Sequence, residues 1–178
     1  ALGYKALYYN TTGSANVAIG NQTLLFNTTG SYNTAVGVGS LYTNTTGSNN
    51  TASGYYALRA NTTGMHNTAY GKDALSSNIT GGYNTASGNG SLYANTASHN
   101  TAYGNGSLYD NTTGISNTSI GSLSLYDNTT GNYNTATGYQ SLNSNTTGNY
   151  NSANGYNALY FNTTGSNNVA TGQSALQS

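Results

Sequence analysis

Residues that could take part in catalysis or metal binding are few in this chain of 178 residues. The sequence holds two histidines, His66 and His99, and three acidic residues, among them Asp110 and Asp127. An imidazole can act as a general base or a metal ligand, and carboxylates suit calcium. Cysteine is absent, so disulfides and thiolate metal sites are excluded.

The spacing of these residues does not favour a shared site. The two histidines occur in sequence units that are two apart, which places them about 10 Å from each other if the units stack like β-strands. That distance is too long for shared metal ligation. Asp110 and Asp127 occupy equivalent positions of consecutive units, where they could share a cation, although two carboxylates are few ligands for calcium. We therefore expect no catalytic residue, no cofactor and no metal, and we interpret the histidines as exposed loop residues.

The tripeptide Asn-X-Ser/Thr, the acceptor sequence for N-linked glycans, suggests a different chemistry. Stacked units about 5 Å apart leave little room for a glycan on each unit. A Thr-rich segment capped by Asn explains the same residues without any sugar, and both interpretations stay open here. The candidate glycan acceptors are Asn10, Asn27, Asn44, Asn61, Asn78, Asn111, Asn128, Asn145 and Asn162.

These asparagines mark a tandem repeat whose consensus is N-T-T-G-x-x-N-T-A-x-G-x-x-(A/S)-L-x-x. The spacing is 17 residues, except for one step of 16 after Asn95. The short unit lacks one residue between its two asparagines, with Ser98 near the place of the glycine, so we expect a tighter corner there. The units begin at Asn10, Asn27, Asn44, Asn61, Asn78, Asn95, Asn111, Asn128, Asn145 and Asn162.

Each unit predicts one coil of an all-β solenoid, or parallel β-roll. Glycine at the fourth and eleventh positions favours two corners, because glycine tolerates positive φ. Between the corners lie two short segments, N-T-A-x and (A/S)-L-x-x-N-T-T, whose length and Thr content suit strands. Coils stacked at about 4.8 Å would give a rod about 50 Å long. We expect residues 1–178 to form a single tandem-repeat section.

Positions 14 and 15 of the unit are both restricted: position 14 is Ala, Ser or Thr, and position 15 is always Leu. Because neighbouring strand residues point to opposite faces, this pattern indicates that both faces are covered. We predict that the small residue faces the lumen and that Leu faces another copy of the chain. The alternative places Leu inside and the small residue outside. The predicted subunit-contact stripe is Leu7, Leu24, Leu41, Leu58, Leu75, Leu92, Leu108, Leu125, Leu142, Leu159 and Leu176.

Two further columns follow from the repeat. The Asn of each N-T-A segment, such as Asn50, predicts amide ladders between coils and caps on the adjoining turn. Tyrosine often follows the Leu, and we expect these rings to stack from coil to coil, with binding of sugars or surfaces as the alternative. The tyrosines of this file are Tyr8, Tyr42, Tyr93, Tyr109, Tyr126 and Tyr160.

The charge of the chain limits its partners. Charged residues make up 3% of the sequence and the formal net charge is zero, so no charge field attracts nucleic acid or anionic membranes. No apolar run approaches the roughly 18 residues of a membrane span. We expect the chain to associate with itself, as a homo-oligomer or fibre, with surface glycans as a second candidate partner. Nucleic acid and a membrane span are not expected.

The recurrent N-x-A-x-G-x-x-(A/S) motif, with "ANVAIG" at residues 15–20, resembles the head repeats of trimeric autotransporter adhesins (YadA-like) and related tail-fibre repeats of phages. That resemblance implies a left-handed parallel β-roll with three chains side by side. It also implies an extracellular location, on a cell surface or in a virion fibre. The unit here is longer than the family's shorter head repeat, and the additional residues carry N-T-T-G.

We therefore expect a non-catalytic structural repeat section of an extracellular fibre or adhesin. The alternatives are a heavily N-glycosylated extracellular fibril and an ice-binding β-solenoid. The second rests on "SNNTASG" at residues 48–54, which resembles a grass ice-binding β-roll, and on outward Thr that could order water. That Thr file is interrupted by Val17, Ser152 and Val169, and it consists of Thr34, Thr51, Thr68, Thr85, Thr101, Thr118 and Thr135.

Overall fold

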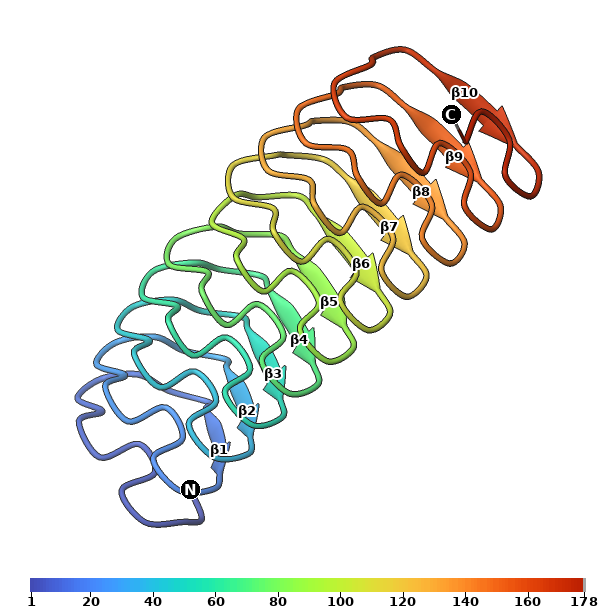
Figure 1. Ribbon diagram of the computed structural model, residues 1–178. Coiled ribbons are helices and arrows are strands. Elements are labelled where there is room, and N and C mark those ends of the chain that lie inside the picture. The colour runs from blue at the N-terminus through green and yellow to red at the C-terminus, as the bar shows by residue number, and fades with distance from the viewer. Residues whose placement is uncertain (178) are drawn as a thin grey trace.

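A computed structural model describes residues 1–177 as a rod of stacked coils, with the two termini at opposite ends of the rod (Figure 1). Within these residues each repeat contributes one short strand, and the strands form one parallel sheet in sequence order. The strands are β1 (Val17–Ile19), β2 (Thr34–Val36), β3 (Thr51–Ser53), β4 (Thr68–Tyr70), β5 (Thr85–Ser87), β6 (Thr101–Tyr103), β7 (Thr118–Ile120), β8 (Thr135–Thr137), β9 (Ser152–Asn154) and β10 (Val169–Thr171).

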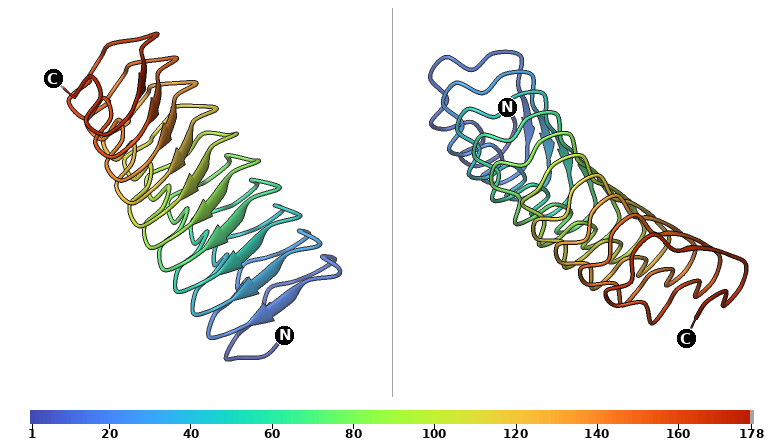
Figure 2. Two further views of the ribbon diagram at one scale, coloured as in Figure 1. Left: turned by 90° about the vertical axis from the view of Figure 1, so that its right-hand side faces the viewer. Right: turned by 90° about the horizontal axis from the view of Figure 1, so that it is seen from above.

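The register of the sheet confirms that one repeat makes one coil of an all-β parallel solenoid. Thr34 pairs with Thr51, and Thr51 pairs with Thr68, each a full repeat further along the chain. At the short unit Thr85 pairs with Thr101, so the lost residue is absorbed outside the strands. The views in Figure 2 show the successive coils lying over one another along the whole rod.

Each strand is three residues long because only its central side chain enters the lumen. The middle residue, Ala in nearly every coil, is buried, while the residues on either side point outward. Ala35, Ala52 and Ala69, for example, have no exposed surface. A small residue fits here because the opposite wall of the narrow coil is close by.

The second predicted strand, over the (A/S)-L-x-x-N-T-T segment, is wrong. In the coil that contains Leu41, residues 38–43 form consecutive turns. Gly39 and Leu41 have φ of 63° and 50°, which is the left-handed region. The amide of Leu41 nevertheless donates to the carbonyl of Ala57 in the next coil at 3.0 Å. This segment therefore bonds coil to coil without forming a strand.

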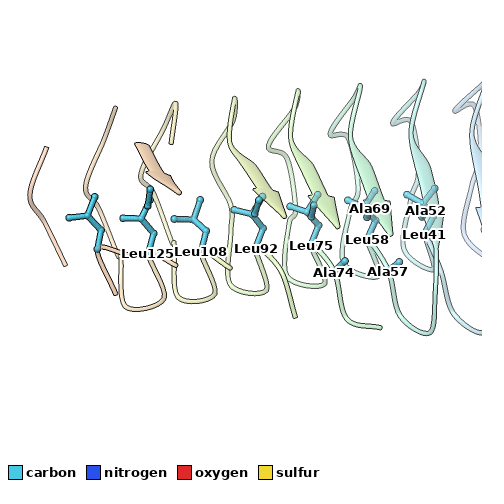
Figure 3. Packing of buried hydrophobic residues seen from close by; sticks show 14 of the residues in the cluster. Leu41, Ala52, Ala57, Leu58, Ala69, Ala74, Leu75, Leu92, Leu108 and Leu125 are labelled. Carbon is cyan, nitrogen blue, oxygen red and sulfur yellow. The ribbon is translucent and has the colours of Figure 1, made fainter. Parts of the chain in front are cut away.

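The prediction that the leucines face another copy is also wrong, because the leucines fill the lumen of their own chain (Figure 3). The residue before each buried leucine is buried as well, so the alternative with the small residue outside is wrong in that half. The alternation argument fails because the leucine backbone is left-handed, not extended. Leu24, Leu41, Leu58, Leu75, Leu92, Leu108, Leu125, Leu142 and Leu159 are buried, whereas Leu7 is half-buried and Leu176 is exposed in the end coils.

Burial explains why leucine accepts this backbone. The left-handed conformation costs a residue with a β-carbon roughly 1–2 kcal/mol. Full burial of a leucine side chain contributes about 1.5–3 kcal/mol, and the backbone bond to the next coil is kept. Stacked leucines such as Leu58 and Leu75 also pack directly on one another along the rod (Figure 3).

The two glycines of the unit serve different purposes. The glycine at position 11 needs its positive φ, which is 142° at Gly88. The glycine at position 4 does not have positive φ, contrary to our expectation. It is required because a β-carbon would collide with the next coil: at Gly47 that atom would lie 2.8 Å from the amide nitrogen of the Asn61 side chain.

We expect Gly88→Ala to lower the free energy of unfolding much more than Gly90→Ala in the same coil. A β-carbon at Gly88 would lie 2.5 Å from the carbonyl carbon of Gly104, whereas one at Gly90 would meet the movable Tyr109 ring at 3.0 Å. We expect a loss of about 1 kcal/mol at Gly90 from the left-handed backbone alone. At Gly88, overpacking adds about 1–3 kcal/mol. Denaturant titrations of both variants measure the difference, and equal losses would contradict the close-approach argument.

Candidate functional site

Two columns of stacked asparagines run along the interior of the rod. In the first column Asn44 donates from its Nδ2 to Asn27 Oδ1 at 2.8 Å, and Asn61 donates to Asn44 Oδ1 at 2.8 Å. The same Nδ2 of Asn61 also donates to the carbonyl of Gly64 at 3.0 Å, which closes the turn that follows. Each amide therefore links two coils and caps its own corner.

The second column, formed by the Asn of N-T-A, bonds in another way. The backbone amide of Asn50 donates to Asn33 Oδ1 at 3.0 Å, and the side-chain Nδ2 of Asn50 donates to Gly64 O at 2.9 Å. Asn67 repeats this arrangement with its amide on Asn50 Oδ1 at 2.9 Å. The predicted amide ladders are therefore confirmed, but the Nδ2 of this column caps a corner of the next coil and not the adjoining turn of its own coil.

The structure gives no support to N-glycosylation at the candidate acceptors. A glycan would have to attach to Nδ2. In the folded chain this nitrogen is buried, and it donates one hydrogen bond to the ladder and one to the corner. The sequon is a consequence of ladder Asn followed by two Thr. Seven of the proposed acceptors have no exposed surface: Asn27, Asn44, Asn61, Asn78, Asn111, Asn128 and Asn145. The other two, Asn10 and Asn162, are half-buried in the end coils and also donate from Nδ2.

The threonine after the first asparagine has a role that the sequence analysis missed. Its hydroxyl donates to the carbonyl of the equivalent residue one coil further on, as in Thr28 to Thr45 at 3.0 Å and Thr45 to Thr62 at 3.1 Å. The near-invariance of Thr at this position was the available signal. It indicates a repeated bond between coils at the corner.

The tyrosine file is continuous over only part of the rod. Tyr93, Tyr109 and Tyr126 stack face to face, with ring centroids 4.9 and 5.1 Å apart. Tyr42 instead meets Phe26 edge to face. In a stack, neighbouring rings cover one another's faces, so the file offers mainly ring edges to a ligand. Stacking from coil to coil is therefore confirmed for this stretch of the file.

The histidines lie in an aromatic stack that the sequence analysis did not identify. Tyr83 lies between His66 and His99, with ring centroids 4.8 and 5.1 Å away and nearly parallel planes. All three residues have left-handed backbone directly before the second asparagine of their coils. Their shared position in the repeat was the signal that could have revealed the stack. The two imidazoles are exposed, and the Tyr83 ring lies between them.

The acidic pair occupies the same place in adjoining coils. Asp110 and Asp127 are both half-buried, and their backbones are linked through the amide of Asp110 on the carbonyl of Tyr126 at 3.0 Å. Burial raises the pKa of the Asp127 carboxyl, and the negative charge of Asp110 raises it further. Within residues 1–177 no group of three or more His, Cys, Asp or Glu is arranged to hold a metal ion.

The outer face of the sheet carries the threonine file in register. Thr51, Thr68 and Thr85 pair across successive strands, and their side chains point outward. The neighbouring outward column is mixed, since Tyr70 and Tyr103 project from it at 49% and 46% exposure. The face is therefore not a uniform lattice of hydroxyls. Ice binding stays a prediction.

Comparisons with known proteins give no relative for this chain. No family model, no curated protein and no solved structure matches it. The structure therefore defines the class of the protein by its fold alone: it is a parallel β-solenoid with internal asparagine ladders. Within the described residues 1–177, the chain has no helix long and apolar enough to cross a membrane.

We expect Asn61→Ala to destabilise the fold by about 3 kcal/mol, because it removes two donated bonds and leaves buried groups unpaired. Two matched controls separate the loss of the ladder bonds from the loss of the sequon and from the loss of any amide side chain. Thr63→Ala destroys the same sequon at an exposed position, and Asn105→Ala removes an exposed amide from another coil. Both controls should change the free energy of unfolding by less than about 0.5 kcal/mol. Equal losses in all three variants would refute a specific role for the ladder.

Because of the acidic pair at Asp110 and Asp127, we expect the free energy of unfolding to fall as the pH rises above about 4, which is the ordinary pKa of an aspartate. Because the pKa of Asp127 is raised in the folded chain, the folded state binds its proton more tightly than the unfolded state does. This advantage is complete below the unfolded pKa and is lost as the pH passes the raised value. Asp127→Asn should weaken this dependence and raise the melting temperature at neutral pH. An unchanged pH profile would contradict the pairing.

Proposed function

We propose that this chain is a non-catalytic structural repeat section of an extracellular fibre or adhesin, of the cell-surface or phage tail-fibre type. The observation that carries the proposal is the repetition of one set of bonds between coils. A strand pairing, two asparagine bonds and a leucine contact recur from coil to coil. Such an interface lets a rod grow in length by adding repeats, which is the property that a fibre requires.

The chemistry of the rod suits an environment outside the cell. Its interior is held by neutral hydrogen bonds and apolar packing, and the ion pair between Lys72 and Asp73, 3.4 Å long, lies at the surface. Salt screens interactions between exposed charges but has little effect on buried neutral bonds. The fold should therefore withstand wide changes of ionic strength, as an extracellular fibre must.

A side-by-side homotrimer is the finer part of the proposal, and it is supported by the resemblance to YadA-like head repeats. The leucines cannot provide the contact, because they are internal. The outward residues of the sheet offer the alternative surface, with Tyr70, Tyr103 and Ile120 between 43% and 49% exposed. Aromatic and aliphatic side chains of this kind are typical anchors of protein interfaces.

Native mass spectrometry of the 178-residue chain tests the assembly, and a homotrimer is the expected mass. Tyr70→Arg combined with Tyr103→Arg should release monomers that keep the circular dichroism spectrum of the folded chain, with a melting temperature that no longer depends on protein concentration. Tyr32→Arg, at an exposed corner of the coil, is the matched control and should leave the trimer intact. A wild-type chain that is monomeric at micromolar concentration would refute the trimer.

The fibre role is tested separately from the subunit number. An antibody against the repeat should label intact cells or virions of the source and decorate elongated projections in electron micrographs. Labelling only after the cells are opened would refute the extracellular role.

A further inference from the structure

The corner at the start of each coil is normally closed by a group of bonds to the next coil. In the coil that begins at Asn44, the amides of Thr45, Thr46 and Gly47 all donate to the carbonyl of Thr62, at 2.9, 3.2 and 3.2 Å. The hydroxyl of Thr45 donates to the same carbonyl at 3.1 Å. These donors share one acceptor and clamp the corner.

The clamp is missing between the coil that begins at Asn78 and the short coil that follows. Within residues 1–177, the amides of Ile79, Thr80 and Gly81 donate to no backbone carbonyl of the next coil. Ile79 replaces the usual threonine, so no hydroxyl is available there either. Ile79 and Thr80 are exposed, so water can reach this corner.

The asparagine ladder is also weakest at this step. Asn95 Nδ2 lies 3.5 Å from Asn78 Oδ1, compared with 2.8 Å between Asn61 and Asn44. With one residue missing from its turn, Asn95 instead donates to the carbonyl of Ala97, only two residues on, at 2.8 Å. Its Oδ1 accepts from Asn100 at 3.1 Å, a bond between the two columns. The shortened turn has therefore drawn Asn95 away from its neighbour.

The other sides of the same interface are intact. Strands β5 and β6 remain paired, and the amide of Thr85 donates to Asn100 O at 2.9 Å. The leucine side is held by the amide of Leu92 on Ser107 O at 3.0 Å. One corner thus lacks the backbone bonds of the clamp and is held by side-chain bonds at Ser98 and Ala97, while the two remaining sides keep their backbone bonds, which is the geometry of a hinge.

We propose that the corner between residues 79–81 and 95–98 is a hinge built into the rod. Bending toward any other side would break strand pairing or the leucine contacts. Bending that opens this corner meets no backbone bond from the amides of residues 79–81 to the next coil. It stretches the long ladder contact and strains two side-chain bonds at the edge of the corner, from the Gly82 amide to Ser98 Oγ at 3.0 Å and from Asn84 Nδ2 to the Ala97 carbonyl at 2.8 Å. The rod therefore flexes at this step and opens here first under load. The hinge is a property of the folded chain and does not depend on the proposed function.

Hydrogen exchange on the folded 178-residue chain provides the first test. The amides of residues 79–81 should exchange at least tenfold faster than those of residues 45–47, which occupy the same positions in a clamped corner. Equal protection of the two corners would overturn the proposal.

Two variants make the test specific: one, the repair variant, restores the missing residue in the short coil, and the other removes a residue from a normal coil. Inserting Gly between Ala97 and Ser98, together with Ile79→Thr, restores the usual length and hydroxyl and should slow exchange at residues 79–81 to the rate of residues 45–47. Deleting Thr46 should create a second open corner and speed exchange at residues 28–30 at least tenfold. Circular dichroism shows whether each variant folds. A folded repair variant with unchanged fast exchange would refute the missing residue as the cause.

Distance measurements test the bending itself, and the absence of cysteine makes site-specific spin labelling simple. Labels at Thr63→Cys and Thr113→Cys span the hinge over three coil steps. Labels at Thr113→Cys and Thr164→Cys span three clamped steps, and all of these positions are exposed. The distance distribution across the hinge should be at least twice as wide as the control and should narrow in the repair variant. Equal widths for the two pairs would overturn the hinge.

Discussion

The stacking of buried asparagine amides is the interaction on which the rest of the structure depends. An unpaired amide inside a protein costs about as much as the bond it lacks, so each asparagine fixes both its own corner and the position of the next coil. Asn61, for example, joins Asn44, Gly64 and Asn78. The requirement that every coil supply the same amide at the same place explains why the chain repeats itself so closely.

The regular stacking of the coils requires unusual backbone conformations. Three positions of each coil adopt left-handed backbone without being restricted to glycine, including every described leucine of the lumen. Such residues are unfavourable alone. Most of them persist because they are buried or because their amides donate to a carbonyl of an adjoining coil, as Tyr32 does to Ser14. The same cost in backbone energy is therefore offset in the same way in most coils. The outer surface is left free to vary, and the variable residues are found there.

The short coil shows how local this compensation is. One residue fewer between two asparagines leaves strand pairing and the leucine column unchanged, yet it removes the backbone bonds at a single corner. A solenoid distributes its stability over neighbouring coils, so a defect of this kind stays confined to one step. A rod can therefore contain a flexible point without losing its overall architecture.

The sequence by itself determined the architecture: the repeat length, the strand at N-T-A, the stacked asparagines and the coil-to-coil aromatic contacts all follow from residues that recur in register. It also suggested a second strand at the leucine, which the structure replaces with turns. It could not determine which way the leucines point, because the two-residue alternation that was assumed holds only for extended backbone. The left-handed turns at Leu41 and its equivalents are stable only when the next coil is present. The same is true of the sequon asparagines, whose burial is created by neighbouring coils. Only the tertiary structure could therefore decide that both sets lie inside.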